Sequence, residues 1–294
     1  MARLVVFGLL VYMLVPCPAG STEFTDAVGR RIELDAPPQR IISLAPAVTE
    51  TLYAIGLGAK IVAATQYCTW PEEARQLPRV GEYADPGLEN ILLFRPDLVI
   101  ASADMNRPAL VERLTELGIP VYVVYPRNIN DALATIRALG ELGGNSTAAE
   151  KLAEDIEVRL ARLAAKLAGQ NKPGVLGTVM LDPLTVAGPE TFVSDIISRA
   201  GGRNLVPPGP SRYPAWNDES LLTTDPDVII VTNHPGQPDP TLYFKRWPQL
   251  RAVQAGRIIE INADWIHRPG PRMILGIETL ARALHPELDI EVPK

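Results

Sequence analysis

One eighteen-residue pattern occurs twice in the chain. "YADPGLENILLFRPDLVI", which begins at Tyr83, aligns without a gap with "YPAWNDESLLTTDPDVII", which begins at Tyr213, so the offset is constant at 130 residues. Each copy places an acid, Glu89 or Glu219, ahead of apolar residues that lead to a Pro-Asp pair and a short apolar run. Such a run after a turn is typical of a buried strand. We call this combination of acid, short apolar segment, Pro-Asp pair and strand the repeated corner. A chain that contains it twice is expected to fold into two related halves.

The order of the predicted elements indicates an α/β fold. In the first half the apolar runs "RIISLA", "AKIVAAT", "DLVIAS" and "IPVYVVY" alternate with helical patterns, and in the second half "GVLGTVML", "DVIIVT" and "GRIIEI" do the same. Strands that alternate with helices are typical of a parallel sheet. Because 294 residues are enough for two domains, we expect two Rossmann-like lobes.

A long helix is predicted between the two halves. The segment that begins at Thr147 opens with a capping-box pattern, leucine or isoleucine then recurs every three or four residues, and no glycine or proline interrupts it before Gly169. A helix from Thr147 to Ala168 would be about 33 Å long. That length favours a bridge between lobes over the alternative, an ordinary surface helix of a single domain. We predict an N-terminal lobe over residues 21–145, a single bridging helix over 146–170, and a C-terminal lobe over 171–294.

The N-terminal segment has the features of an export signal. "MARLVVFGLLVYMLVPCPAG" combines one arginine, an apolar core and a small-residue exit, and the core is too short to span a bilayer comfortably. We therefore predict a signal peptide over residues 1–20 and an exported protein, with a buried N-terminal strand as the alternative. Cys17 is a candidate for lipid attachment, which Pro16 disfavours. Cys68 is then the only cysteine of the mature chain, so no internal disulfide is expected there.

Composition and motifs argue against several classes of function. The formal charge of −6 disfavours nucleic acid and anionic membranes as partners. The sequence contains no G-x-S-x-G, P-loop, H-E-x-x-H or C-x-x-C motif. Its histidines, His234, His267 and His285, are scattered, so we predict neither catalytic residues nor a histidine-based metal site. The alternative is an exported α/β enzyme whose motif is not recognisable.

Large aromatic side chains lie in predicted loops of both halves. They are Tyr67, Trp70, Tyr83, Tyr213, Trp216 and Trp265. Ligands of doubly wound sheets bind beyond the carboxyl ends of the strands, so loops that follow strands and carry large rings are candidate ligand walls. For any single ring, packing within its own loop is the alternative. Their recurrence in both halves favours a ligand cleft between two lobes.

Five stretches of the chain carry a resemblance to a known family. They are "SLAPAVTE", "YCTWP", "GLENILLFRPDLVIA", "AGG" at residues 200–202, and "DWIHRPGPR". They resemble the class III periplasmic binding proteins of ABC importers, and the likeness runs from about Asp26 to the C-terminus. It implies two α/β lobes joined by one rigid helix, a ligand in the cleft between them, no cofactor, and delivery by a monomer to a permease dimer. "YCTWP" and "DWIHRPGPR" favour the members that bind a corrinoid such as vitamin B12, and haem or ferric-siderophore carriers on the same fold are the alternative.

The resemblance also implies roles for individual residues. The ligand-contacting positions of the corrinoid-binding members fall on Pro46, Ala47, Tyr67, Tyr83, Trp216, Asp264, Trp265 and Arg268. Glu89 and Glu219 fall on the two acids that dock into arginine pockets of the permease, one from each lobe. The chain departs from the family at Ser102, where some relatives carry tryptophan, and at Tyr83, where tryptophan is usual.

Several of these residues have structural alternatives. Glu89 and Glu219 could simply begin helices, where an acid is favourable by about 0.3–1 kcal/mol. Asp264 could be a cap or turn residue ahead of a final helix that starts near Pro271. Arg268 could neutralise nearby acids.

Overall fold

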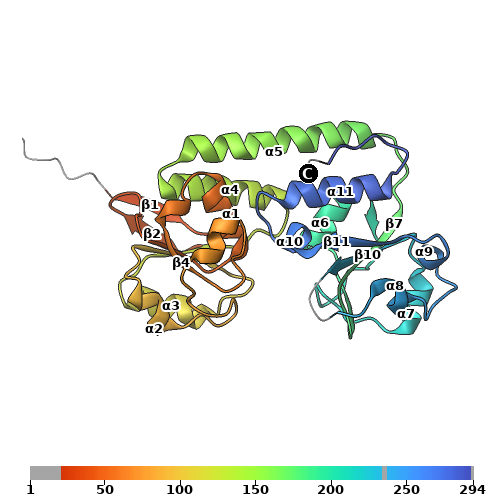
Figure 1. Cartoon of the computed structure of the whole chain (residues 1–294), viewed down its shortest axis with the longest axis horizontal. Coiled ribbons are helices and arrows are strands. Elements are labelled where there is room, and N and C mark those ends of the chain that lie inside the picture. The colour runs from red at the N-terminus through yellow and green to blue at the C-terminus, as the bar shows by residue number, and fades with distance from the viewer. Residues whose placement is uncertain (1–20, 234–236, 293–294) are drawn as a thin grey trace, which may run out of the picture.

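The structure of the chain is a computed structural model that describes residues 21–233 and 237–292 (Figure 1). The predicted signal peptide with Cys17, and also His234, lie outside the described residues. Two α/β lobes lie side by side beneath one long helix, α5 (Ser146–Leu167), which runs along the top of both (Figure 1). The predicted fold class is confirmed. Within the described ranges, no helix is long and apolar enough to cross a membrane.

The N-terminal lobe contains ten helices and strands of the described chain, besides two short 3-10 helices at Gly58–Lys60 and Glu72–Gln76. They are β1 (Thr22–Thr25), β2 (Arg31–Leu34), β3 (Ile41–Ser43), α1 (Pro46–Ala54), β4 (Ile61–Ala64), α2 (Leu88–Leu93), β5 (Leu98–Ser102), α3 (Pro108–Glu116), β6 (Val121–Val124) and α4 (Ile129–Gly143). The main sheet has the order β4-β3-β5-β6, and all its pairings are parallel. Strand β5 is buried along its whole length, which is why its sequence is one continuous apolar run.

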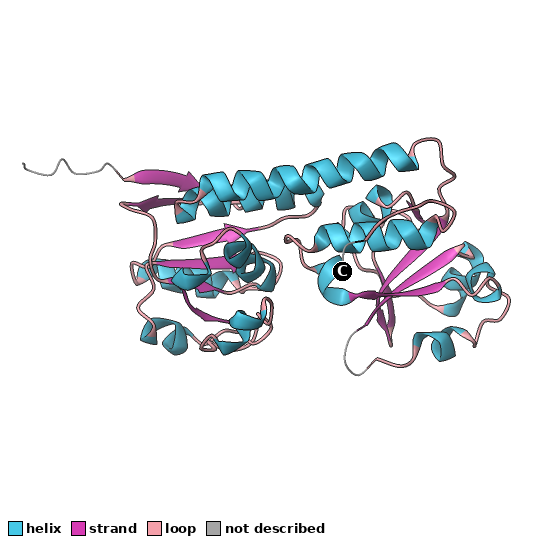
Figure 2. Cartoon of the chain, turned by 45° about the horizontal axis from the view of Figure 1, so that its top comes forward, coloured by secondary structure: helices cyan, strands magenta, loops and turns pink. Residues whose placement is uncertain are grey.

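The C-terminal lobe is built on a second sheet (Figure 2). Its elements are β7 (Gly174–Leu181), β8 (Leu184–Val186), α6 (Phe192–Arg199), β9 (Arg203–Asn204), α7 (Asp218–Thr224), β10 (Val228–Asn233), α8 (Pro240–Phe244), α9 (Arg251–Gln254), β11 (Ile258–Asn262), α10 (Ala263–His267) and α11 (Met273–Leu284). The strand order is β11-β10-β7-β8, with β9 also paired to β7. The pairings of β10 are parallel, whereas β8 is antiparallel to β7. This sheet is therefore mixed, unlike the first.

The repeated corner has the same structure in both lobes. Helices α2 and α7 begin at equivalent residues, Leu88 and Asp218, and each is followed by a buried strand, β5 or β10. A left-handed backbone conformation recurs after each helix, at Arg95 (φ 43°) and Asp225 (φ 42°). Such angles are uncommon for residues other than glycine. Their recurrence at matching positions means that the two copies follow one backbone path.

The aspartate of each Pro-Asp pair ties neighbouring strands together. The Asp97 carboxylate accepts hydrogen bonds from the backbone N–H groups of Gln39 (2.7 Å) and Arg40 (2.9 Å), directly before β3. The Asp227 carboxylate accepts one from the N–H of Gly174 (2.6 Å), the first residue of β7. Since β3 pairs with β5 and β7 pairs with β10, both aspartates fix the start of an equivalent strand pair.

Helix α5 is fastened to each lobe by an arginine. It begins and ends one residue earlier than the helix predicted from Thr147 to Ala168, and the lobe boundaries drawn from the sequence remain a prediction. Arg137 of α4 binds Glu150 (2.8 Å) and Glu157 (3.0 Å) of α5. Arg159 of α5 donates through two nitrogens to the Glu278 carboxylate of α11. Ion pairs thus hold α5 to both lobes.

The segment before the last helix differs from its prediction. Trp265 was expected in a loop, but Ala263–His267 forms the one-turn helix α10, whereas α11 begins at Met273, near the predicted start at Pro271. The Asn262 side chain accepts a hydrogen bond from the N–H of Asp264 (2.9 Å) and so begins α10. Gly276 of α11 allows close packing, because a Cβ there would lie 2.6 Å from the Trp265 carbonyl oxygen.

Candidate ligand-binding site

A cavity of about 540 Å³ lies between the two lobes. On the N-terminal side it is bordered by Ala45 after β3, Ser102 at the end of β5 and Val124 at the end of β6. This is the carboxyl edge of a parallel sheet, where ligands of doubly wound folds bind. The C-terminal lobe contributes Val179, Arg212, Tyr213, His267 and Pro269. A volume of this size is in the range of small-molecule sites.

Most of the cavity wall is apolar. Besides the residues at the strand ends, the N-terminal lobe contributes Ala47, Val48, Thr51, Met105, Pro126, Thr135 and Leu139. Polar groups come from Tyr83, Ser102, Asp104, Arg212, Tyr213 and His267. Apolar walls with a few convergent polar groups are typical of sites that orient a large organic ligand.

Tyr83 is fixed by the end of strand β5. Its hydroxyl is hydrogen-bonded to Ser102, and burial raises the pKa of the phenol. Asn106 holds the surrounding backbone, because its side chain donates to the Tyr83 carbonyl (2.7 Å) and accepts from the Ser102 N–H (2.7 Å). The serine that stands where some relatives carry tryptophan therefore supplies a partner for the tyrosine.

The repeated pattern also reaches the cavity. Tyr83 and Tyr213, the first residues of the two copies, both line it. Tyr83 is half-buried, whereas Tyr213 is 41% exposed. The cleft therefore has a pair of related tyrosines, one from each lobe, in unequal surroundings.

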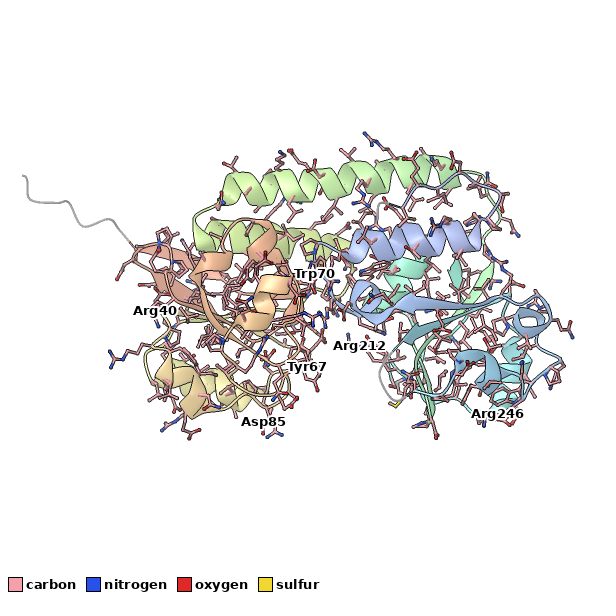
Figure 3. All side chains as sticks on the ribbon, viewed as in Figure 1. Arg40, Tyr67, Trp70, Asp85, Arg212 and Arg246 are labelled. Atoms are coloured by element: carbon pink, nitrogen blue, oxygen red, sulfur yellow. The ribbon has the colours of Figure 1, made fainter. Side chains whose placement is uncertain are left out.

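One ion pair crosses the cleft. Asp104, in the loop after β5, lies 3.6 Å from Arg212 of the C-terminal lobe, and both side chains line the cavity. Burial raises the pKa of Asp104 above its ordinary value of 3.8, and the Arg212 guanidinium opposes that rise. Figure 3 shows Arg212 in the region between the two lobes.

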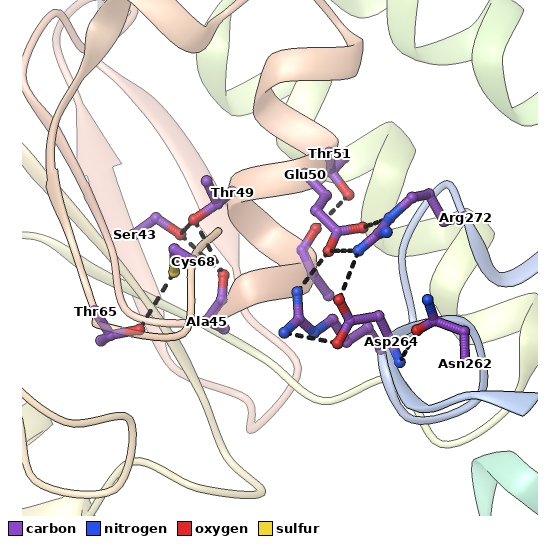
Figure 4. A network of polar contacts seen from close by, with 12 residues as sticks. Ser43, Ala45, Thr49, Glu50, Thr51, Thr65, Cys68, Asn262, Asp264 and Arg272 are labelled. Atoms are coloured by element: carbon purple, nitrogen blue, oxygen red, sulfur yellow. Dashed lines mark hydrogen bonds and ion pairs between the residues drawn. The ribbon is translucent and has the colours of Figure 1, made fainter. Parts of the chain in front are cut away.

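Asp264 and Arg268 form part of a network of ionic contacts between the lobes (Figure 4). Arg268 donates to Glu50 of α1 (3.0 Å) and pairs with Asp264 (2.8 Å). Arg272 binds the same two acids, Glu50 at 2.6 Å and Asp264 at 3.2 Å. Neither Asp264 nor Arg268 lines the cavity, although their neighbours His267 and Pro269 do.

The remaining predicted ligand residues are divided among several places. Ala47 lines the cavity, and Pro46 is buried as the first residue of α1. Tyr67 is 52% exposed and its hydroxyl is hydrogen-bonded to Glu82, which raises its pKa. Trp265 is half-buried on α10.

Trp216 lines a different hollow on the C-terminal lobe. This hollow has a volume of about 1110 Å³, and Tyr243, Arg246 and Trp247 also line it. Val179 borders both this hollow and the cavity between the lobes. Trp216 therefore lies beside the cleft, on the far side of Val179.

Some residues of the site were missed by sequence reasoning. His267 lines the cavity, with its Nε2 atom 3.2 Å from the Thr232 hydroxyl. Both His267 and Arg272 lie in "DWIHRPGPR", a stretch that sequence reasoning had already selected. Glu50 ends the selected stretch "SLAPAVTE", but its role could not be predicted from the sequence, because its partners Arg268 and Arg272 are more than two hundred residues away along the chain. In the part of the chain that the structure describes, no cluster of three or more His, Cys, Asp or Glu side chains could hold a metal ion.

Glu89 and Glu219 are exposed at the second residues of α2 and α7. Both helices lie at the lower side of the molecule in Figure 1, opposite α5 and in different lobes. The two acids are thus displayed on the same side of the protein. Each also stands in the first turn of its helix, where a carboxylate is favourable.

A cleft between two α/β lobes joined by one helix defines a class of ligand-binding proteins, and sequence comparison leads to the same class. A family model described as periplasmic binding protein matches residues 41–265. The chain therefore belongs to the periplasmic binding protein family. Members of this family bind solutes, which agrees with the absence of catalytic motifs from the sequence.

Individual relatives are more specific. The vitamin B12-binding protein of Photorhabdus laumondii subsp. laumondii is 34% identical over 256 residues, which are 86% of this chain and 90% of that protein. The crystal structure of the periplasmic vitamin B12-binding protein BtuF of Vibrio cholerae is similar with a TM-score of 0.77, at 31% identity over 85% of this chain and 98% of that one. The resemblance inferred from the motifs is thereby confirmed. The corrinoid in these names is a ligand, not a cofactor.

Haem-binding proteins share the fold as well. A periplasmic haem-binding protein from Pseudomonas aeruginosa is similar with a TM-score of 0.79, at 26% identity over 87% of this chain and 95% of that one. Likeness of fold alone therefore does not separate a corrinoid site from a haem site.

Proposed function

We propose that this protein is a periplasmic carrier that captures a corrinoid in the cleft between its lobes and delivers it to a dimeric ABC permease. The observation that carries the proposal is the apolar cavity at the carboxyl edge of the N-terminal sheet, closed from the other side by residues of the C-terminal lobe. Relatives named for vitamin B12, at up to 34% identity among those compared, support the choice of ligand. The carrier acts as a monomer and performs no bond chemistry.

The chemistry of the cavity suits the edge and faces of a corrin. Apolar side chains such as Val48, Met105 and Leu139 offer contact area to the ring. The Asp104 carboxylate and the Arg212 guanidinium offer an acceptor and donors to the amide groups at the corrin rim. Because cobalamin exceeds a typical drug-sized ligand, we expect part of it to extend out of the cavity, past Val179 towards the hollow that Trp216 lines.

Haem is the second candidate ligand, and one observation favours it. His267 lines the cavity, and imidazole is a common axial ligand of haem iron. Its Nε2 atom, however, already lies within hydrogen-bond distance of the Thr232 hydroxyl. Tyr83 is less suited, because burial raises the pKa of its phenol and so opposes the tyrosinate form that ligates ferric iron.

Glu89 and Glu219 are proposed as the residues that dock the carrier on the permease. Each is exposed, and the two come from equivalent positions in different lobes. Their carboxylates would accept charge-assisted hydrogen bonds from arginine guanidinium groups, one acid for each permease subunit. Neither residue lines the cavity, so docking and ligand binding use separate surfaces.

Calorimetry and visible spectra with cobalamin, cobinamide and haemin test the ligand. We expect one site for a corrinoid, with sub-micromolar affinity, which corresponds to about −8 kcal/mol or better. Haemin binding far more tightly than either corrinoid would overturn the proposal. In that case a His267→Ala variant would show whether the histidine is the axial ligand.

A further inference from the structure

Glu50 is a buried acid that faces the opposite lobe. It lies on α1 of the N-terminal lobe, and its side chain is 2% exposed. A carboxylate removed from water is costly unless it is paired and hydrogen-bonded. Its partners are Arg268 and Arg272, more than two hundred residues along the chain and in the C-terminal lobe. The charge of this buried acid is therefore compensated across the boundary between the lobes.

Both oxygens of Glu50 are used. Oε1 accepts from Arg268 Nη1 (3.0 Å) and Arg272 Nη2 (2.6 Å), and Oε2 accepts from Arg272 Nε (2.8 Å). Asp264, which is more exposed than Glu50, contacts both arginines. Two carboxylates thus meet two guanidinium groups, so the cluster is neutral as a whole. Removal of Glu50 alone would leave an uncompensated positive charge at a buried position.

The surroundings of Arg272 also join the lobes. Its guanidinium lies over the ring of Trp70, which belongs to the N-terminal lobe, at 4.7 Å from the ring centroid. Two residues earlier, Gly270 packs on the backbone of α1, since a Cβ at this glycine would lie 3.2 Å from the Ala47 carbonyl oxygen. The contact is therefore close at the level of the backbone as well as the side chains.

The cluster is directly connected to the ligand cavity. Ala47 and Thr51, on either side of Glu50 in α1, line the cavity, as do His267 and Pro269 on either side of Arg268. A change in the distance between Glu50 and the two arginines would move both walls of the cavity. We propose that Glu50, Arg268 and Arg272 form a clamp that fixes the angle between the lobes and thereby the width of the ligand cleft.

Glu50 is thus a positioning residue for ligand binding. The effect of the clamp on ligand affinity rests on the proposed function, whereas its effect on lobe geometry does not. The test therefore begins without ligand. Spin labels are placed at exposed positions of the two lobes, Glu112→Cys and Lys245→Cys, in the full chain with Cys17→Ser, since Cys68 is fully buried. Double electron–electron resonance then reports the distribution of distances between the lobes.

The clamp predicts a change in that distribution in Glu50→Gln. This substitution keeps the shape of the side chain and removes its charge, so we expect the distribution to broaden at least twofold. The matched control is Asp26→Asn, which removes a buried acid of the N-terminal lobe. Asp26 is 5% exposed and accepts hydrogen bonds from backbone N–H groups of its own lobe, such as Arg30 (2.8 Å). We expect this control to lower the melting temperature without broadening the distribution.

A double variant separates a clamp from a merely structural ion pair. Glu50→Gln with Arg272→Gln restores the balance of charge, so the melting temperature should partly recover while the distribution stays broad. Cobinamide should bind roughly tenfold more weakly to both Glu50 variants. Unchanged distributions in folded Glu50→Gln and in the double variant would overturn the clamp, whatever happens to melting. If no corrinoid binds even the unchanged protein, the proposed function fails, and the distance measurement still decides the clamp.

Discussion

The two lobes share a corner but not a ligand wall. In both lobes a short helix with an acid in its first turn is followed by a residue in the left-handed conformation. A strand then begins, and its aspartate accepts a hydrogen bond from the backbone next to the neighbouring strand. Towards the cleft they diverge, because the N-terminal lobe supplies most of the apolar wall and the buried Glu50, whereas the C-terminal lobe supplies Arg212, Arg268 and Arg272. The repeated part serves the fold and the outward face and contributes one tyrosine from each lobe to the cavity, whereas the other lining residues come mostly from outside the repeat. Function therefore has to be argued from the site and not from the repeat.

The largest expected effect comes from removing Glu89 and Glu219, the equivalent exposed acids of the two lobes. Glu89→Ala and Glu219→Ala should each weaken docking on the permease by about 2–5 kcal/mol, because a permease arginine loses its partner. The double variant should lose docking in a pull-down assay and still bind corrinoid normally. Glu116→Ala, at another exposed acid of the N-terminal lobe, is the control. If the double variant still docks, the two acids have no role in docking and only stabilise the first turns of their helices.

The paired tyrosines offer the next comparison. Tyr83→Ala should weaken corrinoid binding by about 1–3 kcal/mol, as expected for a buried aromatic anchor. Tyr213→Ala should cost less than about 1 kcal/mol, because this ring is more exposed. Titration calorimetry on both variants measures the difference. Equal losses would mean that the two lobes hold the ligand symmetrically.

The shared strand starts predict similar effects in the two lobes. Asp97→Ala leaves the N–H groups of Gln39 and Arg40 without this acceptor, and Asp227→Ala removes the acceptor of the Gly174 N–H and the partner of Arg251, so each should lower the free energy of unfolding by about 1 kcal/mol. Urea unfolding provides the measurement, and Asp35→Ala, an exposed acid before β3, serves as the reference. A loss confined to one lobe's variant would show that the copies differ in energy despite their common backbone.

The smallest effect concerns pH. Because the folded pKa of Asp104 is raised, the native state holds this proton more tightly than the unfolded state does. Its contribution to stability is therefore greatest at low pH and falls as the pH rises from about 3.8 through the folded pKa. Asp104→Asn should remove this part of the pH dependence, measured as melting temperature from pH 3.5 to 7. An unchanged profile would mean that Arg212 neutralises the acid fully.

Local patterns predicted the fold better than the site. The apolar stripe and the absence of breakers located α5 to within one residue at each end, because helix periodicity is a property of the segment itself. The Pro-Asp pairs likewise located β5 and β10. Helix α10 was missed, since a single turn begun by Asn262 leaves almost no periodic signal.

The site depended on distant pairs. Family resemblance selected Arg268 and Asp264, but no spacing in the sequence connects them with Glu50, which is 218 residues away from Arg268. Trp216 was predicted as a ligand residue, and the structure places it in the neighbouring hollow, where its backbone N–H donates to the Leu184 carbonyl of β8 (2.8 Å). Such relations arise only when two lobes meet, so no local pattern contains them.

The two fasteners of α5 have a mechanical consequence. The helix, about 33 Å long, is held to the N-terminal lobe through Arg137, at Glu150 and Glu157, and to the C-terminal lobe through Arg159. A continuous helix offers no loop residues in which large backbone rotations can be absorbed, so the lobes cannot swing apart as if on a flexible joint. A pull applied at Glu89 and Glu219, on the side opposite α5 (Figure 1), would instead load the helix as a stiff beam. The work of opening the cleft would then be stored as elastic bending and returned when the carrier is released.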